Sequence, residues 1–313
     1  MDNLKHVNMA KLPLYSVLLL LCLAGLLLSF TELGSATAHH SQGDTPVRAA
    51  IEADTSPIIV IVPHPDDEAF GFSGVLGSAV AAGSPVRVYL LSDGEHAKAA
   101  STWLSHQADA SSSKRRGALS ESDRQRFGLA RRAEFFDSME ALGVPATCLV
   151  LMGELCRKGE LETPLSAGII AGHIRGDCLQ AGFPLDEKTR IFTVAPQLGD
   201  CNASQLYGEQ HRCQIPKMHE LSARAAALLC SEPEGLQPAQ VYFFKVYAHG
   251  RHDAQAPIVI PATTESRHFR AEAIGKYSDI GKLSAPRIYR GALKSEVEYA
   301  STLQQVRDAG FSY

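Results

Sequence analysis

A short run of apolar residues, Ile-Ile-Val-Ile-Val directly after Pro57, places the strongest constraint on the fold of this chain. All five of its residues are apolar and β-branched, so a strand made from them has no side suited to water. Strands buried on both faces belong to parallel sheets that carry helices above and below. The run therefore predicts an α/β architecture.

Segments with strand and helix patterns alternate along the chain after this run. This order predicts a mostly parallel sheet with helices on both faces, formed by a single domain. A long, Ser-rich connection from Lys98 to Arg126 interrupts the alternation, and we expect a loop there. Besides the strand at 57–62, the predicted strands are 85–94, 146–152, 189–196 and 239–248, and the predicted helices are 68–83, 129–143, 164–182 and 216–232.

The overall composition is that of a globular protein. Of the 313 residues, 45% are hydrophobic and 20% are charged, which excludes a disordered chain. The net charge of -4 gives no reason to expect a nucleic acid or an anionic membrane surface as partner. The sequence does not indicate an oligomeric state.

The N-terminal segment has the features of an export signal. Lys5 and Lys11 precede an uncharged apolar stretch, residues 12–30, and small residues follow at Ala36 and Ala38. We expect residues 1–38 to be a signal peptide, or an N-terminal signal anchor whose apolar stretch tethers the protein to a membrane. We expect the rest of the chain to consist of a linker at residues 39–56 and one folded domain at residues 57–313. Either alternative predicts an exported protein that is periplasmic, extracellular or membrane-anchored. The chain has seven cysteines, of which Cys22 lies in the apolar stretch, and the other six permit up to three disulfides.

The sequence His-Pro-Asp-Asp-Glu, residues 64–68, follows the first predicted strand directly. Three carboxylates this close repel one another, which favours a cation among them. His64 and Asp67 are three residues apart on a turn, and zinc accepts imidazole nitrogen and carboxylate oxygen. Asp66 then remains to act on water as a general base. A solvated turn that only caps the next helix would need one Asp and no histidine, so we favour a metal site.

Three motifs together resemble the PIG-L/LmbE family of zinc-dependent N-acetylglucosaminyl de-N-acetylases. They are PHPDDE at 63–68, LLSDGE at 90–95 and RRAEFFDSMEALGV at 131–144, and the resemblance extends from about Pro57 to Ala248. It implies a Rossmann-like fold and a Zn²⁺ ion, or another divalent metal, as cofactor. In that family the His and the second Asp of the first motif bind the metal, and the first Asp is the base. The resemblance thus implies His64 and Asp67 as ligands and Asp66 as the catalytic base.

The third metal ligand departs from the family pattern. The family usually supplies it from a His-Pro-Asp-His segment after the fourth strand, and this chain has no such segment there. His211 matches the last histidine of that pattern best, and His219, near the start of the next predicted helix, is the alternative. We therefore assign His211 as the third ligand and keep His219 open.

The resemblance also implies a substrate. We expect Asp93, Glu95 and Arg131, from the second and third motifs, to bind an N-acetylated sugar, and we expect the enzyme to remove the N-acetyl group from an N-acetylglucosamine-containing glycoconjugate. The alternative is a carbohydrate-binding relative of the same fold that is non-catalytic or has altered specificity. Two other classes are excluded, because neither a G-x-S-x-G nucleophile turn nor a G-x-G-x-x-G dinucleotide motif follows the first strand.

Overall fold

The apolar run forms β1 (Ile58–Val62), and all of its side chains are fully buried. In the computed structural model, β1 belongs to a seven-stranded sheet with the strand order β3-β2-β1-β4-β5-β7-β6. The first five strands in this order are parallel to one another, whereas β7 is antiparallel to both β5 and β6. The predicted α/β class with a mostly parallel sheet is confirmed.

The structure describes a defined part of the chain, and the elements below lie within it. The described residues are 54–95, 97, 99–107, 119–153, 166–196, 217–230, 240–246, 258–277, 297–302 and 304–305. The other strands are β2 (Val86–Leu90), β3 (Leu149–Leu151), β4 (Arg190–Val194), β5 (Val241–Phe244), β6 (Ile258–Pro261) and β7 (Val297–Thr302). The helices are α3 (Asp67–Gly71), α4 (Ser73–Ala81), α5 (Ala99–Gln107), α6 (Glu121–Ala141), the short 3-10 helix η3 (Ala146–Cys148), α8 (Ala167–Ala181), α10 (Lys217–Leu229) and α11 (Thr264–Lys276).

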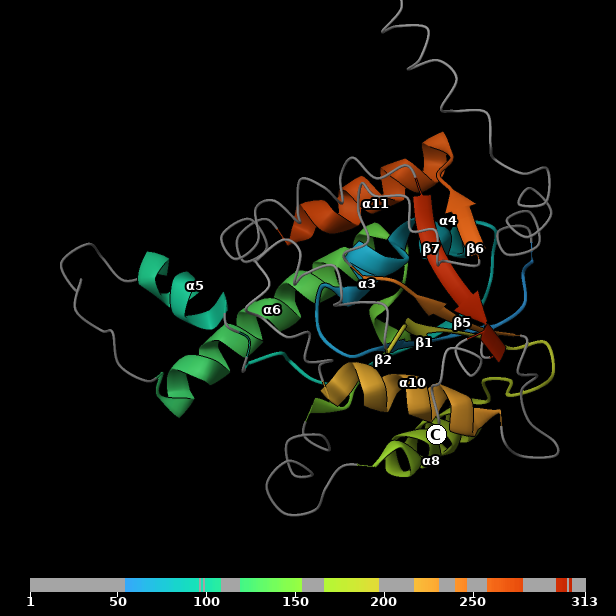
Figure 1. Ribbon diagram of the computed structural model, residues 1–313, viewed down its shortest axis with the longest axis horizontal. Helices are drawn as coiled ribbons and strands as arrows, with labels where there is room; N and C mark the ends of the chain where they lie inside the picture. Colours follow the sequence, from blue (N-terminus) through green and yellow to red (C-terminus); the bar gives the residue numbers. More distant parts are fainter. Residues whose placement is uncertain are drawn as a thin grey trace, which may run out of the picture. The chain divides into compact units, whose positions relative to one another are not determined.

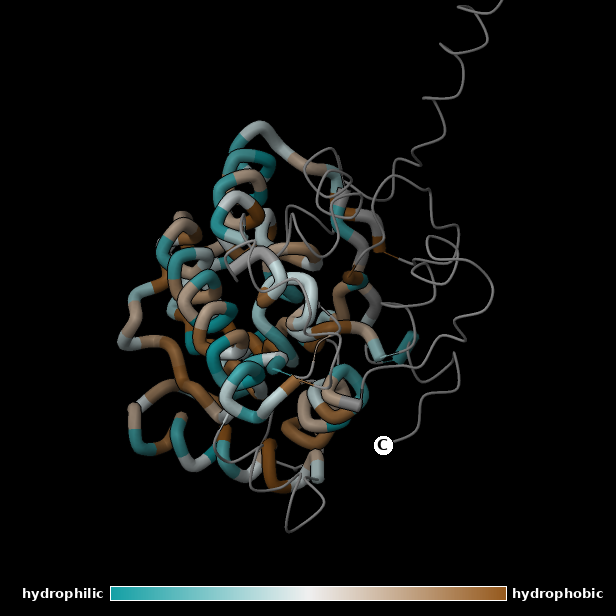
Figure 2. The backbone as a smooth tube through the Cα atoms, turned by 90° about the vertical axis from the view of Figure 1, so that its left-hand side faces the viewer, coloured by the Kyte–Doolittle hydropathy of each residue, from teal (hydrophilic) through white to brown (hydrophobic). Residues whose placement is uncertain are grey.

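Helices cover both faces of the sheet. Figure 1 shows α8 and α10 on one side and α3, α4, α6 and α11 on the other. Alternate residues of β1 point into two separate cores, Ile59 and Ile61 toward α8 and α10, and Ile58, Val60 and Val62 toward the opposite layer. In Figure 2 hydrophobic and hydrophilic residues alternate along the helices, as expected for helices that pack one side on a sheet.

The break between α3 and α4 differs from the single helix that we predicted over 68–83. Phe72 separates the two helices with φ −152° and ψ 18° and is fully buried. Its ring lies 5.0 Å from that of Phe244 and 6.3 Å from that of Phe192, measured between centroids. The break directs this ring onto β4 and β5, which a continuous amphipathic pattern does not reveal.

Part of the connection expected to be a loop is helical. Within Lys98–Arg126, α5 occupies Ala99–Gln107 and α6 begins at Glu121, while residues 108–118 lie outside the described part. Trp103 on α5 is 8% exposed and packs edge-on against Phe127 of α6, with ring centroids 5.7 Å apart. This indole therefore stabilises the contact between α5 and α6.

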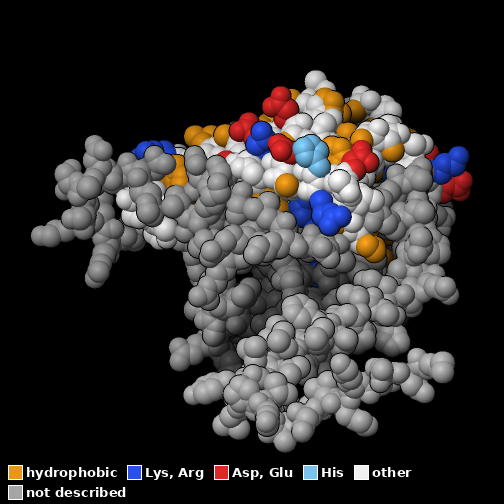
Figure 3. Space-filling view, turned by 90° about the horizontal axis from the view of Figure 1, so that it is seen from above, with side chains coloured by type: hydrophobic (Ala, Val, Ile, Leu, Met, Phe, Trp, Pro, Cys, Tyr) orange, Lys and Arg blue, Asp and Glu red, His pale blue; other side chains and the backbone are white. Residues whose placement is uncertain are grey.

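The elements α11, β6 and β7 were not predicted from the sequence. Glu298 of β7 lies beside the start of α4, where its carboxylate accepts hydrogen bonds from the backbone N–H groups of Gly74 and Val75 at 2.7 and 2.9 Å. The same carboxylate pairs with Arg270 of α11 at 2.7 Å, and both side chains are buried. A carboxylate is favoured at this helix N-terminus, so Glu298 joins the two late elements to α4. On the one face seen in Figure 3, acidic and basic side chains of the described residues lie interspersed.

The N-terminal apolar stretch, residues 12–30, lies outside the described residues. Among the helices that the structure describes, none combines the length and the apolar character needed to cross a bilayer. Of the six cysteines that could form disulfides, Cys148 and Cys178 have free thiols, so the upper limit of three disulfides is not reached. Cys156, Cys201 and Cys213 lie outside the described residues.

The close approach of α4 to α11 yields a stability prediction. A Cβ atom added at Gly77 would lie 2.4–2.9 Å from atoms of the Phe269 side chain, including its Cβ. We expect Gly77→Ala to lower the free energy of unfolding by about 1–3 kcal/mol, because the packed helices cannot accommodate the methyl group.

Gly172→Ala is the matched control, since Gly172 lies within α8 and an added Cβ there meets no atom within 4 Å. It should raise the stability by about 0.4–1 kcal/mol. Urea titration of both variants measures the difference, and equal effects would show that α4 and α11 are not closely packed.

Candidate active site

The turn that follows β1 lies at the carboxyl edge of the parallel strands. The backbone N–H groups of Leu91 and Ser92 donate to the carbonyls of Val62 and Pro63 at 2.9 and 3.2 Å, and Ser92 Oγ donates to Pro63 O at 2.9 Å. These bonds tie the turn to the residues that follow β2. Ligands bind outside the carboxyl ends of strands in open α/β sheets, and the structure places the His-Pro-Asp-Asp motif there.

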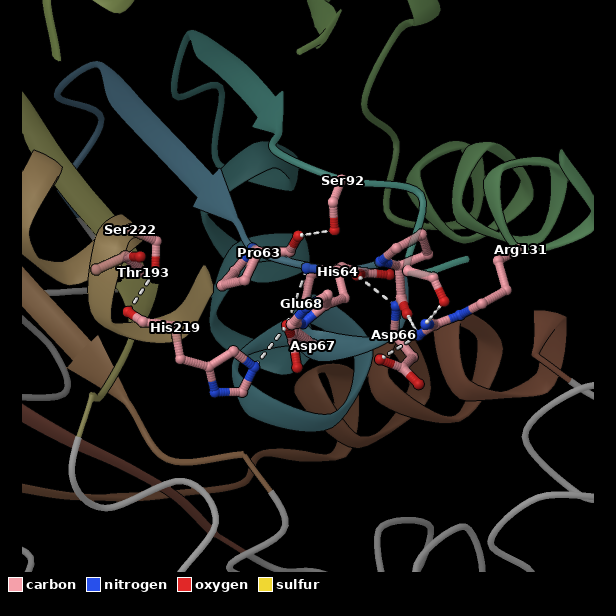
Figure 4. Close-up of polar contacts among 12 residues, drawn as sticks. Pro63, His64, Asp66, Asp67, Glu68, Ser92, Arg131, Thr193, His219 and Ser222 are labelled. Atoms are coloured by element: carbon pink, nitrogen blue, oxygen red, sulfur yellow. Dashed lines mark hydrogen bonds and ion pairs between the residues drawn. The ribbon is translucent and has the colours of Figure 1, made fainter. Parts of the chain in front are cut away.

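Asp67 lies between two histidines that come from distant parts of the chain. His64 Nδ1 and His219 Nε2 each lie 3.1 Å from Asp67 Oδ2, and the backbone N–H of His64 donates to the same oxygen at 3.0 Å (Figure 4). His64 belongs to the turn after β1, whereas His219 lies in the first turn of α10. One nitrogen of each ring and one carboxylate oxygen lie within 4.8 Å of one another. Two imidazoles and one carboxylate form a donor set that suits a catalytic zinc ion.

The other oxygen of Asp67 also points to a missing positive group. Asp67 Oδ1 is buried and has no hydrogen-bond partner among the residues that the structure describes, and the residue as a whole is only 1% exposed. A buried carboxylate oxygen is costly unless it is paired or bound to a metal. This oxygen therefore fits a bound cation better than a purely structural ion pair.

The protonation states also suit a metal. Burial alone would raise the pKa of Asp67, but His219 and His64 hold it well below its usual range. Burial lowers the pKa of His64, although Asp67 acts in the opposite direction. An ionised carboxylate beside a neutral imidazole is the form in which both groups bind metal.

Asp66 is not part of the donor cluster and has a different partner. One of its carboxylate oxygens, Oδ1, lies 2.9 Å from Arg131 Nη2, and the same guanidinium donates to the carbonyl of Pro65 (Figure 4). Burial, together with the carboxylates of Asp67 and Glu68, raises the pKa of Asp66 to about 8, while Arg131 acts against this rise. A carboxyl group whose pKa lies near neutrality can both accept and return a proton.

Glu68, in the first turn of α3, is fully buried. Its Oε1 accepts hydrogen bonds from Tyr277 OH at 2.5 Å and from Ser138 Oγ at 2.9 Å. Its Oε2 accepts a hydrogen bond from the backbone N–H of Asp66 at 3.2 Å. Burial raises the pKa of Glu68 to about 7, and the hydrogen bonds from Tyr277 and Ser138 limit the rise.

The residues predicted to bind substrate are buried and contact other parts of the protein. Asp93, Glu95 and Arg131 are 5%, 8% and 5% exposed. Asp93 pairs with Arg132, whose Nε lies 3.0 Å from Asp93 Oδ1, and Arg131 donates to the carbonyl of Gly94 at 3.3 Å. Arg131 thereby links the segment after β2 to the motif after β1. That these residues bind substrate stays a prediction.

Of the two histidines considered for the third metal ligand, the structure brings His219 to Asp67, while the preferred His211 lies outside the described residues. A signal for His219 was present in the sequence. The helix predicted at 216–232 follows a parallel strand, so its first turn must lie near the carboxyl edge of the sheet. The similarity of His211 to the family pattern instead favours the segment before this helix.

Part of the chain matches the model of a known protein family. Residues 59–177 match the PIG-L family model, described as GlcNAc-PI de-N-acetylase. No curated protein matches the chain. His219 lies beyond the matched residues, so the site joins the matched segment to a later part of the chain.

Two solved structures are similar to this chain at low identity. The 4-carboxy-2-hydroxymuconate hydratase from Pseudomonas putida is 14% identical, with 79% of this chain and 95% of the hydratase covered and a TM-score of 0.50. The N,N'-diacetylchitobiose deacetylase from Pyrococcus horikoshii is 13% identical, with 83% of this chain and 88% of that one covered and a TM-score of 0.47. We take the hydratase as support for the fold alone. The resemblance predicted from the three motifs is confirmed by the match of residues 59–177 to the PIG-L family model.

Proposed function

We propose that this protein is a metal-dependent hydrolase that removes the N-acetyl group from an N-acetylglucosamine-containing glycoconjugate. The observation that carries the proposal is the cluster of His64, Asp67 and His219. Asp66, which precedes Asp67 in the sequence, lies outside this cluster and pairs with Arg131. The family description, GlcNAc-PI de-N-acetylase, supports the reaction and the sugar.

The described residues fit a zinc ion. His64, Asp67 and His219 would hold it, and three protein ligands leave a coordination position for water or substrate, as in catalytic zinc sites. The buried, unpartnered Asp67 Oδ1 supports this assignment. A zinc ion bound there would supply Lewis-acid chemistry, which makes water more acidic and polarises an amide carbonyl.

The remaining steps belong to the side chains of this chain. Asp66 accepts a proton from the attacking water as the water oxygen bonds to the acetyl carbonyl carbon. The C–N bond then breaks, Asp66 returns the proton to the amine nitrogen, and acetate and the free amino sugar leave. Arg131 keeps one oxygen of Asp66 fixed during the proton transfers through its 2.9 Å contact.

A non-catalytic carbohydrate-binding relative is the alternative function. It would need the sugar site but not the proton transfer by Asp66. A panel of free, lipid-linked and polymeric N-acetylglucosamine compounds, assayed for binding and acetate release together, separates the two functions. Binding without acetate release from any compound would favour the alternative.

We propose as well that the protein acts outside the cytoplasm, on the basis of the basic residues and the apolar stretch at residues 12–30. A reporter fused after Tyr313 should be active only on the far side of the membrane. Mass spectrometry of the recovered protein should show either cleavage near Ala38 or retention of the anchor. A fusion that is active only in the cytoplasm would contradict export.

The metal assignment predicts about one zinc-class ion per chain in the purified protein. His64→Ala, Asp67→Ala and His219→Ala should each lose most of it, because each removes one of three ligands. His211→Ala is the control and should retain the ion. Elemental analysis measures the content, and loss from His211→Ala with retention in His219→Ala would reverse the assignment.

The base assignment predicts that Asp66→Asn keeps the metal but lowers kcat by about 10²–10⁴-fold, with little change in KM. Asparagine is nearly isosteric with aspartate but does not accept a proton at neutral pH. Steady-state kinetics of acetate release measures the effect.

Asp177→Asn is a matched control, because Asp177 is also paired with an arginine, Arg87, but lies on α8, away from the motif. Its kcat should equal that of the wild type. A wild-type kcat for Asp66→Asn would exclude Asp66 as the base.

A further inference from the structure

Asp66 has an unfavourable backbone conformation. Its φ is 104° and its ψ is −25°, and it is the one non-glycine residue with positive φ in the described part of the chain. Left-handed conformations are costly for residues with a Cβ atom, and they persist only where surrounding contacts impose them. The contacts that hold Asp66 therefore decide where its carboxylate points.

The backbone of Asp66 is held from inside the protein by Glu68. The N–H of Asp66 donates to Glu68 Oε2 at 3.2 Å, and its carbonyl accepts from the N–H of Phe70 at 3.0 Å. The first of these bonds depends on a side chain, so it is only as fixed as the carboxylate of Glu68.

The carboxylate of Glu68 is fixed in turn by Tyr277 and Ser138. Tyr277 follows the last residue of α11 and is 1% exposed, and its hydroxyl donates to Glu68 Oε1 at 2.5 Å. Ser138 of α6 is fully buried and donates to the same oxygen at 2.9 Å. Hydrogen bonds to a buried carboxylate are short and strong, and their loss leaves the charge poorly solvated.

We propose that Tyr277 is a positioning residue for the reaction: through Glu68 it holds the backbone of Asp66 in the orientation that aims the Asp66 carboxylate at the attacking water. This inference rests on the proposed function, in which Asp66 is the base. Tyr277 lies well beyond residues 59–177, the segment that matches the family. A contact from the late helix α11 would thus complete a site whose motif comes early in the chain.

The chain offers a closely matched control for the Tyr277 hydroxyl. Tyr89 is fully buried, and its hydroxyl donates to Asp177 Oδ2 at 2.7 Å, so it too links a buried tyrosine to a carboxylate. It lies in the core between the sheet and α8, whereas Tyr277 lies in the core on the other face. Tyr89→Phe and Tyr277→Phe remove the same group from similar surroundings.

The first test measures the backbone of the motif without any substrate. Amide hydrogen exchange of the segment from His64 to Glu68 is followed by mass spectrometry in the wild type, Tyr277→Phe and Tyr89→Phe. We expect exchange in this segment to be roughly tenfold faster in Tyr277→Phe, because Glu68 no longer holds the Asp66 N–H firmly. Tyr89→Phe should exchange as the wild type does. Equal exchange in all three proteins would overturn the proposal.

The second test measures catalysis. Tyr277→Phe should lower kcat by about 10–100-fold with KM and metal content unchanged, since a displaced base slows the chemical step without weakening substrate binding. Tyr89→Phe should keep the wild-type kcat. In an Asp66→Asn background Tyr277→Phe should have no further effect, because it acts only through Asp66.

An equal loss of kcat with and without the Asp66 carboxylate would overturn the positioning role, as would a loss confined to KM. Ser138→Ala, which removes the second donor to Glu68, should reproduce the direction of both effects if Tyr277→Phe folds poorly. A wild-type protein that releases no acetate from any substrate would reject the proposed function, and the exchange result would still decide whether Tyr277 holds the Asp66 backbone.

Discussion

The contact of the Asp67 carboxylate with two imidazoles is the interaction on which the site depends. Asp67 and His219 are buried and His64 is partly buried, and these three groups from two distant segments meet at one oxygen, Asp67 Oδ2. The other oxygen of Asp67 is buried and has no hydrogen-bond partner within the described part of the chain. Such an arrangement is costly in an apolar interior unless a cation compensates for it. The same contact holds the first turn of α10 against the turn after β1, at the carboxyl edge of the sheet.

Adjacent residues of one motif have different surroundings because the chain turns sharply at Asp66. Asp67 faces the two histidines, Asp66 faces Arg131, and Glu68 is directed into the core toward α6 and α11. The positive φ of Asp66 makes this separation of three neighbouring carboxylates possible. Each can therefore have its own pKa and its own role, although the three are consecutive.

Much of this was predictable from local sequence. The apolar run of β1 and the motif after it predicted the sheet class and the position of the site, because both depend on residues close together in the chain. The partners of the motif were harder to predict. His219 was considered but ranked below His211, and Tyr277 was not considered, since its contact with Glu68 joins residues 209 positions apart. The split at Phe72 and the helix α5 were missed because both depend on aromatic packing against other elements.

The most direct test of the account is X-ray diffraction at the zinc absorption edge from crystals of the protein loaded with zinc. The account predicts an anomalous peak within about 2.0–2.2 Å of His64 Nδ1, His219 Nε2 and an oxygen of Asp67, with Asp66 outside the coordination shell. A peak bonded to Asp66, or one without His219 among its ligands, would contradict it.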